Sequence, residues 1–127
     1  EFFKAALGAN AIQALEVNFT AIDFTSRSSV LGAAKTFEDL GVSAYNGAGK
    51  LIVTPDYLVL AGKIVSVEAR HAAAIRSLLS PGTASFAGDD IVTASTGLDS
   101  AKTPSEVLAV AKSYLKSTLS ASNLPTS

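Results

Sequence analysis

Two stretches of the sequence carry apolar or small side chains at alternating spacings of three and four residues, which is the spacing of one face of an α-helix. The first stretch places along that face Leu31, Ala34, Glu38, Gly41, Tyr45, Ala48 and Ile52. The second places along its face Tyr57, Ala61, Ile64, Glu68, His71, Ile75 and Leu78. The pattern predicts two long helices, over residues 28–50 and 55–80, with these faces turned inward.

Residues typical of helix ends mark where these two helices begin and end. Ser28 or Ser29 is expected to cap the first helix. The second has a capping threonine at Thr54 and a proline at its first position, and it stops at 80–82, where the sequence reads Ser-Pro-Gly. Both helices are therefore bounded by their own local signals.

The rest of the chain predicts shorter helices and a loop. Residues 1–8 are typical of the last turns of a helix that a glycine terminates. Residues 83–102 are rich in Gly, Ser, Thr and Asp and predict a long loop. Thr103 and Glu106 have the spacing of a capping box, which predicts a C-terminal helix over 103–118. We therefore expect an all-α chain that forms a single domain over 1–127.

Composition excludes several classes of protein. The chain has 127 residues, the length of one domain, and 48% of them are hydrophobic, which is enough for a core. The formal net charge is −1 and the basic residues form no patch, so we expect no binding to nucleic acid. There is no cysteine for a disulfide or a thiolate site. No apolar run reaches the roughly 18 residues of a transmembrane helix.

The start of the chain is not typical of a natural N-terminus. The sequence contains no methionine and begins with Glu1, which is too large a residue for normal removal of an initiator methionine. We therefore expect a signal peptide, a pro-segment or a further part of the protein upstream. If the protein is secreted, Asn18 in the triplet Asn-Phe-Thr is a candidate glycosylation site.

Three side chains on the two predicted inner faces are of types that bind metal ions. Glu38 lies on the first face, and Glu68 and His71 lie one turn apart on the second. Iron and manganese take carboxylate oxygen and imidazole nitrogen, and a helix offers two ligands from one face at a spacing of three or four. If the two helices pair in antiparallel fashion, these three side chains meet.

Such a set is half of a known kind of site. In di-metal helical bundles two helices give one Glu each, and two others give a Glu-x-x-His pair. The alternative for Glu68 and His71 is an ordinary surface pair or a core pair satisfied within the protein. Tyr45, two turns from Glu38, is placed either to hydrogen-bond a ligand or to serve as a core tyrosine.

The stretches FEDLGVSAYNGAGKLI (37–52), VEARHAAAIRSLL (67–79) and TPSEVLAVAKSYL (103–115) resemble the ferritin-like family that includes the desiccation-related proteins. The resemblance implies a ferritin-like helical bundle of which this chain carries the last two core helices, a long loop and a C-terminal helix. It places the other helix pair, with its ligands, upstream of residue 1. Only Glu38, Glu68 and His71 match ligand positions, and some relatives lack the histidine, so membership alone does not imply a metal.

Two functions follow from these observations. The sequence favours a structural or stress-associated protein, secreted or in the cell envelope, with no catalysis and no certain cofactor. The alternative is a di-metal site that binds or oxidises iron or manganese. An isolated helix pair would leave its polar face uncovered at a cost of several kcal/mol. We therefore expect either a homo-oligomer or a companion segment that supplies two further helices.

Other catalytic and binding motifs are excluded because the sequence does not supply the residues that they require. The stretch GAGK at 47–50 lacks the earlier glycine and the following Ser or Thr of a phosphate-binding loop. A serine–histidine–acid triad would have to use His71, the only histidine, in the middle of a predicted helix.

Overall fold

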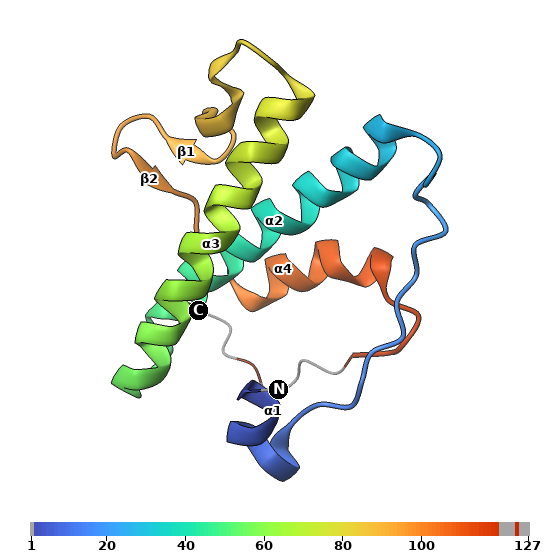
Figure 1. Cartoon of the computed structure of the whole chain (residues 1–127). Coiled ribbons are helices and arrows are strands. Elements are labelled where there is room, and N and C mark those ends of the chain that lie inside the picture. The colour runs from blue at the N-terminus through green and yellow to red at the C-terminus, as the bar shows by residue number, and fades with distance from the viewer. Residues whose placement is uncertain (1, 120–123, 125–127) are drawn as a thin grey trace.

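The protein is mainly helical, as the sequence predicts (Figure 1). The computed structural model describes residues 2–119 and residue 124. Its elements, in chain order, are α1 (Phe2–Leu7), the 3₁₀ turn η1 (Gly8–Asn10), α2 (Arg27–Gly49), α3 (Pro55–Leu79), the 3₁₀ turn η2 (Ala84–Ala87), β1 (Val92–Thr93), β2 (Leu98–Asp99), α4 (Pro104–Ala111) and the 3₁₀ turn η3 (Lys112–Tyr114). No helix of the described part is both long and apolar enough to cross a membrane.

The long helices α2 and α3 cross as an antiparallel pair, and α4 lies against α2 (Figure 1). Their direction is fixed by cross-helix neighbours, because Glu38 contacts His71 while the later Gly41 lies next to the earlier Glu68. Among the described residues, the buried apolar side chains are few and small: Val42, Ala61 and Ala72. Small side chains at this contact allow the two backbones to approach closely.

The inner face predicted for α3 is only partly covered. Tyr57 near the start of the helix, His71 in its second half and Leu78 near its end are all exposed. Val59 and Val67 on the same helix are exposed as well. The expectation that this whole face is turned inward is therefore wrong for the chain as it stands, because α2 covers only one side of α3.

The helix starts differ from the sequence prediction in two details. The cap of α2 is Ser26, whose side chain accepts a hydrogen bond from the backbone N–H of Ser29. Ser29 is not the cap because its own hydroxyl accepts from the backbone N–H of Asp23 in the preceding turn. Thr54 has the extended backbone of a capping residue before Pro55, but its side chain makes no capping hydrogen bond.

The C-terminal helix is shorter than the predicted 103–118. The capping box of Thr103 and Glu106 is present, but α4 ends at Ala111 and continues only as a 3₁₀ turn to Tyr114. The chain then becomes extended, because Leu115 forms an isolated β-bridge with Val17. This long-range pairing replaces the last helical turn.

The segment 83–102 is not a plain loop as predicted. It contains η2 and a two-stranded antiparallel hairpin, in which β1 pairs with β2 through Val92 with Asp99 and Thr93 with Leu98. Gly97 in the turn has a φ of 68°, which glycine adopts without strain. Strands of two residues are too short to show the alternation that identifies a strand in a sequence.

Candidate functional site

The three candidate metal ligands line one open groove between α2 and α3. Glu38 comes from α2, and Glu68 and His71 come from α3. The other lining residues all belong to α3: Leu60, Lys63, Ile64 and Val67. The antiparallel pairing of the helices thus brings together the side chains that the sequence pattern singles out.

Local helix geometry explains why these side chains share a groove. Glu68 and His71 are three residues apart and therefore lie on one face of α3. Gly41 lies on α2 one turn after Glu38 and leaves room for the Glu68 carboxylate. A Cβ atom at position 41 would lie 2.6 Å from Oε2 of Glu68. The glycine therefore permits a carboxylate at the helix contact, where a larger residue would displace it.

The polar groups in the groove are unequally satisfied. His71 Nδ1 lies 3.3 Å from Glu38 Oε1, and the His71 side chain is 56% exposed. Oε2 of Glu68 is buried and has no hydrogen-bond partner among the described residues. Burial raises the pKa of Glu68 above its usual value, the charge of Glu38 raises it further, and His71 partly opposes this. The site therefore holds one carboxylate oxygen that is short of a partner.

Tyr45 lies near this carboxylate and is half-buried. Burial raises the pKa of its hydroxyl, and the negative charge of Glu68 adds to the effect. The hydroxyl therefore stays protonated at neutral pH and keeps a hydrogen to donate.

The residue types of the groove fit half of a metal site. Two carboxylates and one imidazole are the donors that iron and manganese accept. The unpartnered oxygen of Glu68 is the kind of atom that a cation would satisfy. Within residues 2–119, however, no group of three or more Asp, Glu and His side chains is arranged to hold a metal ion by itself. The chain thus provides donors but not a closed site.

A family model described as a ferritin-like domain matches residues 1–81. The chain belongs to the ferritin-like domain family. The matched region ends just after α3, so it contains Glu38, Glu68 and His71 but not the hairpin or α4. No curated protein and no solved structure matches the chain.

The ferritin-like chain also contains an ionic cluster around a buried arginine, which the sequence pattern did not reveal. The guanidinium of Arg76, only 3% exposed, donates to both carboxylate oxygens of Asp39, at 2.9 and 2.7 Å. It also donates to both oxygens of Asp90, at 3.0 and 2.8 Å, and to the carbonyl oxygen of Ser85, at 3.2 Å. Hydrogen bonds from Arg76 lower the pKa of Asp90 to about 2.

This cluster joins α2, α3 and the segment after α3. Lys35 also contacts Asp39, at 3.2 Å, and the Asp39 side chain is only 17% exposed. The sequence feature that could have pointed to this cluster is Arg76, which follows directly after the apolar face predicted for α3 at Ile75. Its partner Asp90 lies in a segment without periodicity, so the pairing could not be inferred.

The candidate glycosylation site has an ordered local geometry. Asn18 is partly exposed, and its side-chain oxygen accepts hydrogen bonds from the backbone N–H of Thr20, at 3.2 Å, and from the Thr20 hydroxyl, at 2.8 Å. The backbone N–H of Asn18 donates to the carbonyl oxygen of Tyr114. The triplet is therefore held at the surface by contacts with the C-terminal segment.

Proposed function

We propose that this ferritin-like chain supplies half of a carboxylate-bridged di-metal site, with Glu38, Glu68 and His71 as its ligands. The observation that carries the proposal is the buried Oε2 atom of Glu68, which has no partner among the described residues and lies beside a second carboxylate and an imidazole. Leaving a buried carboxylate oxygen unsatisfied costs free energy. A bound cation would remove that cost.

Each residue of the groove has a distinct role in this proposal. Glu68 would be the bridging ligand, because its Oε2 atom is buried at the helix contact and Gly41 leaves space for it. Glu38 and His71 would be the terminal ligands, released from their present contact with each other. Tyr45 would donate a hydrogen bond to a ligand oxygen. Bound iron or manganese would supply Lewis-acid or redox chemistry at this position.

The other half of the site would come from a second copy of the chain or from a companion segment with two further helices. A two-fold axis through the groove would bring a second Glu38 and a second pair of Glu68 and His71 to the first set. The exposed apolar side chains that α3 presents beside the groove, among them Val67, would be covered by the same contact. Burial of apolar surface would thus accompany completion of the site.

Metal loading tests the proposal directly. The purified protein is incubated with Mn²⁺, or with Fe²⁺ without oxygen, then desalted and measured by native mass spectrometry and elemental analysis. We expect about one ion per chain if two copies share the site, and about two per chain if a companion segment completes it. Glu68→Gln and His71→Ala should each lower the occupancy about tenfold or more. Asp56→Asn, an exposed carboxylate at the start of α3, is the matched control and should load normally.

Gly41→Ala provides a second test at a position that cannot itself bind a metal. The added methyl group would push Glu68 out of its place, so this variant should also lose occupancy while it keeps all three ligands. A wild-type protein that stays free of metal, or that loads no better than Glu68→Gln, would overturn the proposal.

A structural role is the second candidate function, and one observation favours it. Glu38 and His71 already contact each other at 3.3 Å, so two of the three ligand-type side chains are paired without a metal. The resemblance of residues 37–52 to desiccation-related proteins supports a stress-associated function. In that case the double variant Glu68→Leu/His71→Leu should leave the stability of the fold unchanged or raise it, because the two polar side chains would have no functional role.

A drying assay separates the structural role from metal binding. The chain is dried together with a desiccation-sensitive enzyme, and the enzyme activity is measured after rehydration. The structural role predicts better recovery than with an equal mass of albumin, and the same recovery with the Leu double variant. Recovery no better than with albumin would contradict it.

We further propose that the protein is secreted or located in the cell envelope and carries a glycan on Asn18. The ordered surface turn of the triplet supports this. Expression through a eukaryotic secretory pathway should give a product whose mass falls on treatment with a glycosidase. Asn18→Gln should remove that mass difference, and an unmodified wild-type product would contradict the proposal.

A further inference from the structure

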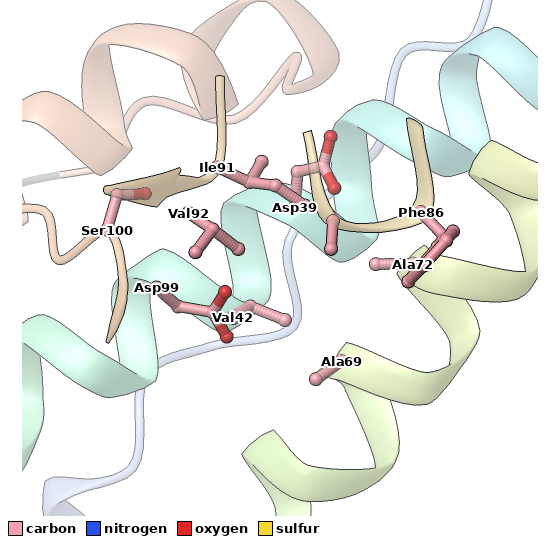
Figure 2. Close-up of a pocket in the computed structure, with 10 residues that line it drawn as sticks. Asp39, Val42, Ala69, Ala72, Phe86, Ile91, Val92, Asp99 and Ser100 are labelled. Carbon is pink, nitrogen blue, oxygen red and sulfur yellow. The ribbon is translucent and has the colours of Figure 1, made fainter. Parts of the chain in front are cut away.

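A second site lies on a different face of α3 from the groove. It is a cavity of about 150 Å³ between α2, α3 and the segment that follows α3 (Figure 2). Its apolar walls come from the two helices and from the segment above them: Val42, Ala69, Ala72, Phe86, Ile91 and Val92. Unlike the groove, it is walled on several sides by residues of both helices and of the segment that follows α3.

The cavity exists because the helix side chains that reach it are small while the segment above them is held in place. Ala69 and Ala72 face it from α3 and leave space that a larger residue would fill. The segment is held by Arg76, which binds Asp90 and the carbonyl oxygen of Ser85. The cavity is thus formed before any ligand arrives, which reduces the cost of binding.

Two carboxylates lie at this cavity, and they differ in their partners. The carboxylate of Asp39 forms ion pairs with Arg76 and Lys35, so its charge is already compensated. Asp99 on β2 is exposed, and its carboxylate makes no hydrogen bond or ion pair with any residue that the structure describes. Figure 2 shows this carboxylate directed from β2 toward the side of the cavity where Val42 lies. The mouth of the cavity therefore carries one available negative charge.

We propose that this cavity binds a small amine, with its apolar body between α2 and α3 and its ammonium group on the carboxylate of Asp99. The size is appropriate, because a dry apolar cavity of about 150 Å³ in another protein holds one benzene ring. A mainly apolar pocket with a few placed polar groups is the usual construction of a small-molecule site. The free carboxylate selects a cation and repels an anion. The proposal does not depend on the metal site.

Benzylamine is a suitable probe, with benzyl alcohol as the neutral molecule of the same shape and phenylacetate as the anion. Binding is measured on the full chain by ligand-observed NMR and calorimetry. We expect benzylamine to bind in the millimolar range or tighter, with an affinity about fivefold above that of benzyl alcohol, as for a partly exposed ion pair. Phenylacetate should bind least.

Two variants locate the binding. Asp99→Asn should lower the affinity for benzylamine to that for benzyl alcohol and leave benzyl alcohol unchanged. Asp89→Asn removes a nearby exposed carboxylate that does not line the cavity, and it should have no effect. Ala69→Leu should fill the cavity and abolish the binding of both probes, with circular dichroism to check that the helices remain.

The outcomes that overturn the proposal are equally definite. They are no binding of benzylamine up to about 10 mM, equal affinity in Asp99→Asn and wild type, or retained binding in a folded Ala69→Leu variant. Perturbation of Asp99 and Ala69 resonances by benzylamine in the wild-type protein would support the proposal even if the leucine variant failed to fold.

Discussion

The replacement Arg76→Ala tests the claim that an ionic cluster around this buried arginine holds the segment after α3 on the helix pair. Arg76 is 3% exposed and makes hydrogen bonds to Asp39, Asp90 and the carbonyl oxygen of Ser85. Loss of one partner of a buried ion pair typically costs about 3–5 kcal/mol, because the remaining charge is left without compensation.

The expected cost falls below that range. Asp90 is 60% exposed and can return to water, and Asp39 keeps its contact with Lys35. We therefore expect Arg76→Ala to lower the free energy of unfolding by about 2–3 kcal/mol. Against a total stability of about 5–15 kcal/mol for an ordinary domain, this is a large fraction.

Urea unfolding followed by circular dichroism at 222 nm measures this change. With a typical slope of about 1–3 kcal/mol per molar urea, the midpoint should fall by about 0.7–3 M. Arg76→Lys should recover only part of the loss, because one ammonium group cannot bind two carboxylates side by side.

Arg70→Ala is the matched control on the same helix. Arg70 is exposed, and its side chain donates to the hydroxyl of Ser66, one turn earlier. Its loss should change stability by about 0.5 kcal/mol or less. Equal midpoints for Arg70→Ala and Arg76→Ala would refute the assignment of Arg76 as the residue that holds the segment.

Three further predictions follow from single contacts. Hydrogen bonds from the Arg76 guanidinium lower the pKa of Asp90 from 3.8 to about 2. The contribution of ionised Asp90 to stability is therefore present above about pH 4 and is lost as the pH falls toward 2. Because the Asp90 side chain is 60% exposed, the loss of stability should be about 1 kcal/mol. The urea midpoints at pH 5 and pH 3 should differ less in Asp90→Asn than in the wild-type protein. Gly47→Ala should destabilise the protein by more than about 1 kcal/mol, because a Cβ atom at position 47 would clash with the backbone of Lys102, ahead of α4. A Cβ atom at position 32 has no neighbour within 4 Å. Gly32→Ala should therefore stabilise the protein by about 0.5–1 kcal/mol in the same assay. Thr103→Ala should lower the thermal midpoint by removing about 1 kcal/mol of capping energy, while Thr54→Ala, at a cap without a side-chain bond, should change it much less.

The sequence by itself determines the helices and the residues that face the groove. The spacing of three and four along each stretch fixes which side chains share a helix face, and this depends only on local backbone geometry. It correctly groups Glu68 with His71 on α3 and Glu38 with Gly41 on α2. Capping is local for the same reason, and the box of Thr103 and Glu106 is formed as predicted.

Only the tertiary structure decides what covers these faces and how the polar groups are paired. The antiparallel crossing leaves His71 exposed and gives Glu68 a place beside Gly41. It leaves Oε2 of Glu68 without a partner in the part of the chain that the structure describes. The fold of 83–102 into a turn and a hairpin, and with it the cavity, depends on Arg76 meeting Asp90. Contacts between residues far apart in sequence leave no periodic signal, because each is a meeting of two side chains that only the assembled fold brings together.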